Sequence, residues 1–308
     1  MSAIIANNLV KHYKSGKEII SAVRGVSLRV EKGELFGIIG PDGAGKTSLF
    51  RMLTTLLLPD DGNAMVDGSD VVKDYKSIRK KVGYMPGRFS LYQDLTVEEN
   101  LQFFATIFNT TIQENYDLIH DIYIQIEPFK NRKAGKLSGG MKQKLALSCA
   151  LIHKPVVLFL DEPTTGVDAV SRKEFWDMLK NLKQQGITIL VSTPYMDEAT
   201  LCDRIALMQT GELMTTGTPA DIVQMFSLPL FAVKGRDMFR LLKDLVDSNL
   251  VQQAYAFGEY HHVIMKAADH NDELQQNLEK NDHKEIVMHR VEPTIEDCFM
   301  QLMQTSHD

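Results

Sequence analysis

Two hydrophobic patterns alternate along the first two thirds of the chain. Short, mainly apolar runs are typical of strands that are buried on both faces of a sheet. These runs occupy residues 35–39, 82–86, 156–160 and 187–192. Segments with apolar residues at helical spacing separate them, at 48–53, 96–108, 112–126, 139–151 and 171–184. Strands that alternate with helices predict an α/β fold.

Other segments of this region alternate apolar and polar residues, which is the pattern of half-buried antiparallel strands. Residues 4–12 and 19–30 have it, and Ser15-Gly16-Lys17 between them is predicted to form a hairpin turn. A second hairpin is predicted at 63–72, with a tight Asp67-Gly68 turn at its tip. A third, at 204–215, closes the region.

The pattern changes after the break at residues 227–229. Six segments follow in the order strand, helix, strand, strand, helix, strand, at 230–233, 238–246, 251–257, 260–266, 273–280 and 285–291. This order suggests a small ferredoxin-like α+β module. The sequence therefore predicts two domains, 1–227 and 228–308. His261 and His262 alternate faces of a predicted strand, so they are expected to be surface histidines rather than ligands of one metal ion.

The composition is that of an ordinary soluble protein, with 44% hydrophobic and 24% charged residues in 308. No apolar run approaches the ~18 residues of a membrane span, and no signal peptide is visible, so the chain is expected to be cytoplasmic. Cys149, Cys202 and Cys298 lack metal-ligand spacing, which fits reduced structural thiols. The net charge is −6, and the acidic excess lies after residue 227. A neutral main body argues against nucleic-acid binding.

A glycine-rich turn between the segments at 35–39 and 48–53 carries the main chemical signal. Its residues are Gly40, Pro41, Asp42, Gly43, Ala44, Gly45, Lys46 and Thr47. Glycines let several backbone N–H groups point at one phosphate, and the next helix adds unpaired N–H groups. Lys46 supplies a positive charge, and the Thr47 hydroxyl is suited to a magnesium ion. The pattern predicts a nucleotide-binding phosphate loop, and a solvent-facing turn is the alternative.

Two further sets of polar residues stand at the ends of predicted elements. Ser138, Gly139 and Gly140 open a helix and form a second anion-binding end, without a lysine. Asp161 and Glu162 follow the apolar run at 156–160. Ligands of parallel α/β sheets bind at the carboxyl ends of strands, where Asp161 is expected to reach magnesium and Glu162 a water molecule.

Tyr13 lies at the edge of the first hairpin turn. Two interpretations of its ring are equally open from the residues alone. It stacks on adenine, or it is one half-buried aromatic of a strand.

Three motifs in order carry a resemblance to a known family. With residues 40–47, 137–143 and 158–162, the segment 4–220 resembles the ATP-binding subunits of ABC transporters. The run L-S-G-G-M-K-Q at 137–143 is specific to that family among phosphate-loop proteins. The resemblance implies a phosphate-loop α/β core with an antiparallel β-subdomain and an α-helical subdomain. The run P-T-I-E-D-C-F at 293–299 is similar to the end of a bacterial type with a C-terminal extension, which usually energises exporters.

The resemblance also implies a mechanism. Two such domains meet head to tail, and each ATP lies between the phosphate loop of one chain and the 137–143 signature of the other. Glu162 would orient or deprotonate the attacking water, and Thr47 and Asp161 would hold Mg²⁺. The implied nucleotide-contacting residues are Tyr13, Gly40, Pro41, Asp42, Gly43, Ala44, Gly45, Lys46, Thr47, Ser48, Ser138, Gly139, Gly140 and Asp168, the last lining the seam between the chains.

Membrane permease subunits are the partners that the resemblance implies. Closure of the two ATP-binding domains would push on these subunits through the surface near Phe89, Leu91 and Tyr92. The chain would therefore lie on the inner face of the cytoplasmic membrane.

Three positions depart from the family pattern. Gly87 stands where the family has a glutamine near magnesium, Pro194 where it has a switch histidine, and Asp42 where asparagine is usual. Glycine and proline offer no side-chain donor, so the chain is expected to bind ATP but hydrolyse it slowly. The intact signature favours an asymmetric heterodimer with a second ATP-binding subunit. The alternatives are a homodimer, and a normal site in which Gln93 or another side chain substitutes.

Two rival functions belong to other classes. A soluble ABC-type ATPase that acts on ribosomes or DNA-repair complexes usually has two ATPase cores or a long coiled coil, and neither is visible here. A non-hydrolytic regulatory subunit is a binding module rather than an enzyme, and the retained Glu162 argues against it.

Overall fold

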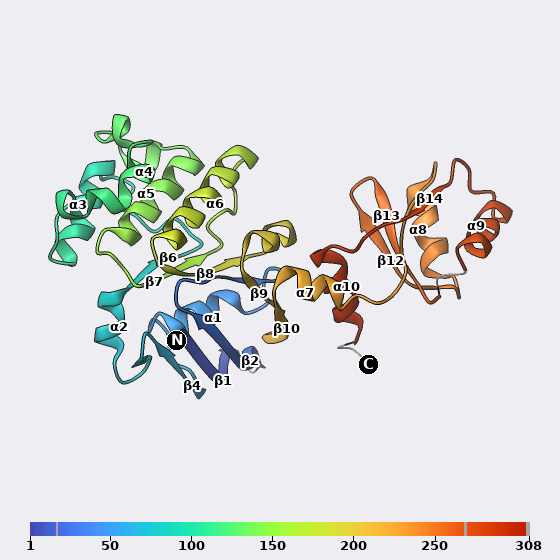
Figure 1. The fold of residues 1–308 in the computed structure, drawn as a ribbon, viewed down its shortest axis with the longest axis horizontal. Coiled ribbons are helices and arrows are strands. Elements are labelled where there is room, and N and C mark those ends of the chain that lie inside the picture. The colour runs from blue at the N-terminus through green and yellow to red at the C-terminus, as the bar shows by residue number, and fades with distance from the viewer. Residues whose placement is uncertain (17, 268–269, 306–308) are drawn as a thin grey trace. The chain divides into compact units, whose positions relative to one another are not determined.

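The computed structural model describes residues 1–16, 18–267 and 270–305. The chain divides into two compact units, Met1–Pro219 and Ala220–Asp308 (Figure 1). The sequence predicted the division later, at 227/228. The structure has α7 (Pro219–Gln224) at the division, a helix that the sequence pattern did not indicate. Among the residues described, no helix combines the length and apolar character needed to span a membrane.

A six-stranded sheet in the order β10-β9-β3-β8-β7-β6 forms the centre of the first unit. Its strands are β3 (Leu35–Ile39), β6 (Val82–Met85), β7 (Val157–Asp161), β8 (Thr188–Thr193), β9 (Arg204–Gln209) and β10 (Glu212–Gly217). Neighbouring strands are parallel except for the antiparallel β9–β10 pair. The predicted α/β core is confirmed, and the carboxyl ends of β3, β7 and β8 lie at one edge of the sheet.

A second, antiparallel sheet has the order β2-β1-β4-β5. Its strands are β1 (Ser2–Ser15), β2 (Glu18–Glu31), β4 (Asp61–Val66) and β5 (Ser69–Asp70). They confirm the two predicted hairpins, although Lys17 of the first predicted turn lies outside the described residues. One hydrophobic cluster joins both sheets to α1 (Lys46–Leu53), and within it the rings of Phe50 and Phe159 meet edge to face at 6.1 Å. The helix that follows the phosphate loop is therefore anchored in the core.

Most of the remaining helices of the first unit lie on the side of the core sheet opposite α1 (Figure 1). The remaining helices are α2 (Tyr75–Lys81), α3 (Val97–Ile107), α4 (Tyr116–Tyr123), α5 (Gly139–Leu151), α6 (Ala169–Gln184) and the 3₁₀ helices η1 (Gln113–Asn115), η2 (Glu127–Phe129), η3 (Ala134–Lys136) and η4 (Met196–Leu201). A reciprocal capping box of Thr96 and Glu99 starts α3. The predicted helical segment at 112–126 is shorter in the structure, where η1 precedes α4.

The second unit follows the predicted order of strands and helices. Its elements are β11 (Leu230–Lys234), α8 (Met238–Val246), β12 (Val251–Phe257), β13 (Tyr260–Met265), α9 (Asn271–Lys280), β14 (Val287–Arg290) and α10 (Ile295–Thr305). The strands form an antiparallel sheet in the order β12-β13-β11-β14. Leu241 of α8 and Leu274 of α9 belong to one hydrophobic cluster, and Met300 of α10 belongs to another. The sequence analysis did not predict α10.

The expectation that His261 and His262 are surface residues is wrong. They are only 5% and 6% exposed. Nε2 of His261 lies 2.7 Å from the carbonyl oxygen of Met238 in α8, whereas Nδ1 of His262 lies 2.6 Å from Oδ1 of Asp297 in α10. The two rings thus contact different helices. His261 is buried against α8, and His262 is buried against α10.

Cys149, Cys202 and Cys298 are free and buried. Burial raises the pKa of each thiol above its ordinary value, which favours the protonated form. Their environment is that of structural thiols.

Candidate functional site

The turn between β3 and α1 requires each of its three glycines. Gly43 and Gly45 have φ values of +80° and +106°, in the region that favours glycine. A Cβ at Gly40 would lie 2.1 Å from the carbonyl oxygen of Met208. Lys46 is 3% exposed, and its Nζ donates to the carbonyl oxygen of Gly40 at 2.7 Å. The loop backbone and the lysine therefore form one compact structure.

The other loop residues differ in exposure. Ala44 is buried, and its carbonyl oxygen accepts a hydrogen bond from the N–H of Gly211 at 2.9 Å. Asp42 is exposed, whereas Thr47 is half-buried in the first turn of α1. Asp42, which stands where asparagine is usual in the family, therefore lies on the solvent side of the loop.

The acidic pair at the end of β7 meets the phosphate loop. Oε1 of Glu162 lies 3.1 Å from Nζ of Lys46. Asp161 is 2% exposed, and its Oδ1 accepts a hydrogen bond from Ser192 Oγ at 2.7 Å. Glu162 has a φ of +50°, a left-handed conformation that costs roughly 1–2 kcal/mol in a residue other than glycine. Two motifs that are distant in the sequence therefore form one site.

Glu162→Gln is expected to strengthen ATP binding by the isolated chain about twofold to tenfold. Glu162 contacts Lys46, the group expected to bind the γ-phosphate, and places a negative charge beside it. Glutamine keeps the size of the side chain but removes that charge, a change worth about 0.5–1.5 kcal/mol. Equilibrium titration with a fluorescent ATP analogue measures the effect. Glu174→Gln, at the Lys144 ion pair, is the matched control, and weaker ATP binding by Glu162→Gln would contradict the expectation.

The oxygen donors at this site suit a hard divalent cation. The Thr47 hydroxyl and the Asp161 carboxylate are the kinds of ligand that Mg²⁺ prefers. In the described part of the chain, no group of three or more His, Cys, Asp or Glu side chains could hold a metal ion by itself. A magnesium ion would therefore take further ligands from nucleotide phosphates and water. Burial, together with the charge of Asp161, raises the pKa of nearby Tyr84 to about 12, so this hydroxyl stays protonated.

Tyr13 lies beside the helix that follows the phosphate loop. Its hydroxyl and Ser48 Oγ are 3.1 Å apart, so the structure brings these two predicted residues together. Tyr13 is 37% exposed, and Ile20, its cross-strand neighbour in β2, is 52% exposed. Tyr13 thus places an accessible aromatic side chain beside the start of α1, and Ile20 is its accessible aliphatic neighbour.

The signature residues form the start of α5 and do not join the phosphate loop of the same chain. Ser138 is the N-cap residue, and its Oγ accepts a hydrogen bond from the N–H of Met141 at 3.3 Å. Ser138 and Gly139 are exposed, whereas Gly140 is buried. Figure 1 shows α5 among α3, α4 and α6, away from α1. The exposed helix start is therefore available to a group outside this chain.

Asp168 has a structural role that the sequence analysis did not predict. It caps α6, where its Oδ1 accepts from the N–H groups of Val170 and Ser171 at 3.1 and 3.0 Å. Donation by the Ser171 N–H and hydroxyl lowers the pKa of Asp168. A Cβ at Gly140 would lie 2.6 Å from Ser171 Oγ. Ser171 therefore contacts both Asp168, the residue predicted to line the seam, and Gly140 of the signature in the same chain.

Gly87 lies next to the acidic pair, with no side chain to contribute. A Cβ at this position would lie 3.0 Å from the carbonyl oxygen of Asp161 and 3.6 Å from Cβ of Glu162. Pro194 directly follows β8. Gln93, the side chain considered as a substitute, packs against Gly135, whose N–H donates to the Gln93 carbonyl oxygen at 2.9 Å.

Sequence reasoning missed a buried carboxylate near this site. Glu198 is 1% exposed, and its Oε2 accepts hydrogen bonds from the hydroxyl groups of Thr164, at 3.1 Å, and Thr193. Its Oε1 has no hydrogen-bond partner, and Nε of Arg172 lies 3.9 Å away. Glu198 thus links the turn after the acidic pair to the end of β8. No local pattern indicates this, because Thr164 and Glu198 are 34 residues apart.

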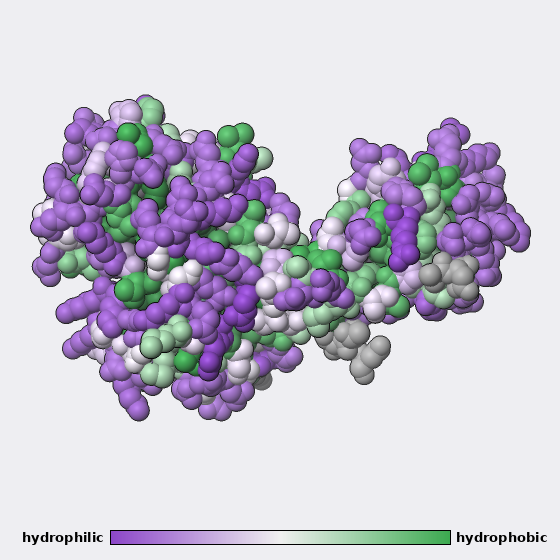
Figure 2. Space-filling view, viewed as in Figure 1, coloured by the Kyte–Doolittle hydropathy of each residue, from purple (hydrophilic) through white to green (hydrophobic). Residues whose placement is uncertain are grey.

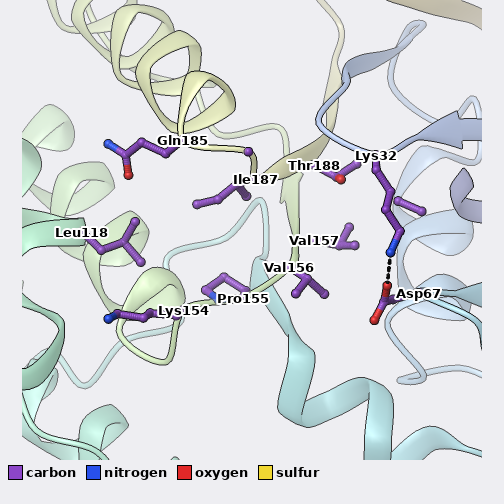
Figure 3. Close-up of a pocket in the computed structure, with 12 residues that line it drawn as sticks. Lys32, Asp67, Leu118, Lys154, Pro155, Val156, Val157, Gln185, Ile187 and Thr188 are labelled. Carbon is purple, nitrogen blue, oxygen red and sulfur yellow. Dashed lines mark hydrogen bonds and ion pairs between the residues drawn. The ribbon is translucent and has the colours of Figure 1, made fainter. Parts of the chain in front are cut away.

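The cavity in Figure 3 is not the phosphate site. It has a volume of about 400 Å³ and includes Val157 and Thr188, at the amino ends of β7 and β8. Lys32 and Asp67 form an ion pair of 2.9 Å at its side. Because the phosphate loop and the acidic pair lie at the carboxyl ends of the parallel strands, this cavity lies at the opposite edge of the sheet.

A second cavity, of about 330 Å³, lies beside the surface predicted to contact membrane subunits. Met85, Leu91, Phe104 and Phe108 are among its lining residues. Leu91 is only 8% exposed, so it lines this cavity rather than the outer surface on which the sequence analysis placed it. Tyr92 is 50% exposed. On the face in Figure 2, hydrophilic residues cover most of the first unit, and the hydrophobic areas are small and scattered.

Comparison with known proteins identifies similar chains. Residues 23–165 match the family described as "ABC transporter". "Probable multidrug ABC transporter ATP-binding protein YbhF" of Escherichia coli (strain K12) is 37% identical over 306 residues, which cover 98% of this chain and 52% of that protein. The chain thus spans about half the length of this relative.

Two further matches cover most of the compared protein. "ABC transporter ATP-binding protein NatA" of Bacillus subtilis (strain 168) is 38% identical over 211 residues, 67% of this chain and 86% of that protein. The structure "Dimeric structure of a post-hydrolysis state of the ATP-binding cassette MJ0796 bound to ADP and Pi" has a TM-score of 0.64 at 28% identity. The match covers 70% of this chain and 98% of that one.

Proposed function

Because this chain belongs to the family of ABC transporter ATP-binding proteins, we propose that it binds MgATP at its phosphate loop and couples ATP hydrolysis to transport. The contact of 3.1 Å between Lys46 Nζ and Glu162 Oε1 carries this proposal, since it joins a phosphate-binding group to a candidate catalytic carboxylate. ATP hydrolysis needs both groups at the same phosphate.

The proposed roles follow from the type and position of each side chain. Lys46 and the N–H groups of the phosphate loop bind the outer phosphates, and Tyr13 stacks on adenine. Glu162 orients the attacking water or accepts its proton. Thr47 and Asp161 hold Mg²⁺, whose charge offsets that of the phosphates.

A second copy of the fold completes the site in this proposal. The exposed start of α5, with Ser138 and Gly139, presents unpaired N–H groups and the positive end of the helix dipole. These groups would contact the γ-phosphate of ATP bound to the opposite chain, and Asp168 would line the seam. Head-to-tail pairing of two ATP-binding domains would therefore form two composite sites.

The chain's own composite site is proposed to be slow. Gly87 has no side chain beside the acidic pair, and Pro194 has no donor to offer a phosphate. Loss of one preorganised donor typically costs about 10²–10³-fold in rate, and two losses in one site need not add. A homodimer would have two slow sites. A heterodimer, in which this signature serves a normal site of a second ATP-binding subunit, is therefore the favoured assembly.

Membrane permease subunits are the proposed partners, and export is the proposed direction. The apolar cavity of about 330 Å³ beside β6 suits a short apolar helix of such a subunit. Tyr92 and Phe103, the sequence neighbours of the lining residues Leu91 and Phe104, are accessible aromatic side chains whose rings are 4.8 Å apart. The chain would then lie on the inner face of the cytoplasmic membrane.

The fold is proposed to divide as the family's pattern implies. The β2-β1-β4-β5 sheet would be the antiparallel β-subdomain, and α3, α4 and α5 would form the α-helical subdomain. The antiparallel order β12-β13-β11-β14 supports a ferredoxin-like accessory domain in the second unit.

Nucleotide binding by the isolated chain tests this function. The wild-type chain is expected to bind a fluorescent ATP analogue with Mg²⁺, and Lys46→Ala to bind it at least tenfold more weakly, because the buried lysine supplies the loop's full positive charge. Lys136→Ala, at an exposed lysine just before the signature, is the control and should bind normally. A folded wild-type chain that does not bind the analogue would refute the function.

Two measurements separate the rival functions. Co-purification with an integral membrane protein is expected for a transporter subunit but not for a soluble ABC ATPase. Slow phosphate release by the isolated chain is expected here, whereas a purely regulatory nucleotide-binding subunit would release none above the level of Glu162→Gln.

A further inference from the structure

One hydroxyl contacts both members of the acidic pair. Ser192 is the penultimate residue of β8, faces Asp161 across the parallel β7–β8 ladder, and is 0% exposed. Its Oγ donates to Asp161 Oδ1 at 2.7 Å and accepts from the N–H of Glu162 at 3.0 Å. A single side chain thus donates to one residue of the candidate site and accepts from the next residue.

The first of these bonds limits the rotation of the Asp161 carboxylate. A bound Oδ1 determines the direction of the second carboxylate oxygen, and Asp161 is a candidate ligand of magnesium. Hydrogen bonds to ligating carboxylates orient them, and their loss typically weakens metal binding by about 10–100-fold. Asp161 is 2% exposed, so bulk water is poorly placed to replace the serine.

The second bond is not needed to keep the backbone satisfied. The N–H of Glu162 also donates to the carbonyl oxygen of Ser192 at 3.0 Å. Alanine at position 192 would keep that backbone bond and remove only the hydroxyl. The main loss would therefore fall on Asp161, and the left-handed backbone of Glu162, with its φ of +50°, would keep a partner.

We infer that Ser192 is a positioning residue that orients Asp161 toward the divalent cation of the nucleotide complex. This inference rests on the proposed MgATP-binding function. It assigns a role to a residue outside the phosphate loop, the acidic pair and the signature. The role acts through Asp161, so it should affect metal-dependent nucleotide binding and leave metal-independent binding unchanged.

The test compares nucleotide affinity with and without the metal. The full chain is titrated with a fluorescent ATP analogue in excess Mg²⁺ and again in EDTA. The dissociation constant in EDTA divided by the dissociation constant in Mg²⁺ is the ratio that measures metal coupling. Ser192→Ala is expected to lower this ratio by about tenfold, while its dissociation constant in EDTA stays within about twofold of wild type.

Thr188→Ala is the matched control on the same strand. Thr188 is 2% exposed, and its hydroxyl accepts a hydrogen bond from the N–H of Gly33 at 3.0 Å, at the other end of β8. This variant also removes one buried hydroxyl and should keep the wild-type ratio. A fall in the ratio for both variants would indicate general damage to the sheet and would overturn the inference.

A double-mutant cycle keeps the inference falsifiable if Ser192→Ala has structural effects of its own. Asp161→Asn should also lose metal coupling, and Ser192→Ala should add nothing to it, because the serine acts through that carboxylate. Additive losses, or a Ser192→Ala ratio within about twofold of wild type, would overturn the inference. A wild-type chain that binds the analogue without any effect of Mg²⁺ would overturn it as well. A wild-type chain that binds no analogue would instead refute the proposed function.

Discussion

In an assembled complex with its partner subunits, Ser138→Arg is expected to lower ATP turnover by about 10²–10³-fold, and more than Glu162→Gln does. Ser138 is exposed at the start of α5, where a bulky cation would block the N–H groups that face the opposite chain's ATP. In the proposed heterodimer that opposite site performs most of the turnover. In that assembly Glu162 belongs to the proposed slow site, so its loss would remove little of the turnover.

The comparison distinguishes the alternative assemblies. In a homodimer, or if Gln93 restored a normal site, each chain would supply both a signature and a catalytic carboxylate, and the two variants would be similarly damaging. Asn131→Arg adds the same side chain at an exposed position seven residues earlier and should keep turnover near wild type. A larger loss for Glu162→Gln than for Ser138→Arg would contradict the heterodimer.

Asp297→Ala is expected to destabilise the second unit by about 3–5 kcal/mol. Asp297 is 0% exposed, and its Oδ1 lies 2.6 Å from both the Tyr255 hydroxyl and His262 Nδ1. Its Oδ2 accepts from the N–H and the hydroxyl of Thr294, each at 2.6 Å. Alanine would leave these groups without their acceptor, and buried donors without partners are costly.

The position of the single tryptophan makes this effect measurable. Trp176 lies in α6 of the first unit and is 2% exposed, so its fluorescence reports on that unit, whereas far-UV circular dichroism reports on both. Asp297→Ala is expected to add an early transition in circular dichroism and leave the Trp176 midpoint unchanged. Glu296→Gln, at the exposed neighbouring residue, is the control. A single transition at the wild-type midpoint would disprove the role of Asp297.

Acid should weaken the same cluster. Burial by itself raises the pKa of Asp297, but hydrogen bonds from His262, Thr294 and Tyr255 outweigh it and hold the pKa below its ordinary value of 3.8. A carboxyl group with a lowered pKa in the folded state stabilises the protein above its unfolded-state pKa and loses that contribution as pH falls through the folded-state pKa. Asp297→Asn lacks the titrating carboxyl group, so the unfolding midpoint of its second unit should change less below about pH 4 than that of the wild-type second unit.

Features that depend on neighbouring residues could be predicted from the sequence. The apolar run at 35–39 became β3, Thr96 and Glu99 formed a capping box at the start of the helix predicted at 96–108, and α8 has the predicted ends Met238 and Val246. The phosphate loop belongs to this group as well, because its conformation depends on glycines within eight consecutive residues. The order of motifs was also sufficient to indicate the family.

Contacts between distant segments were decided only by the tertiary structure. Ser192 and Asp161 are 31 residues apart, and they meet because β7 and β8 are neighbours in the sheet. His262 is buried because α10 places Asp297 against it, although its strand pattern predicted exposure. Periodicity shows which face of a strand a residue occupies, but the neighbours on that face depend on how the sheets and helices pack. The sequence by itself thus determined the glycine-rich loop and the helices and strands around it, whereas packing decided which side chains hold the acidic pair in place.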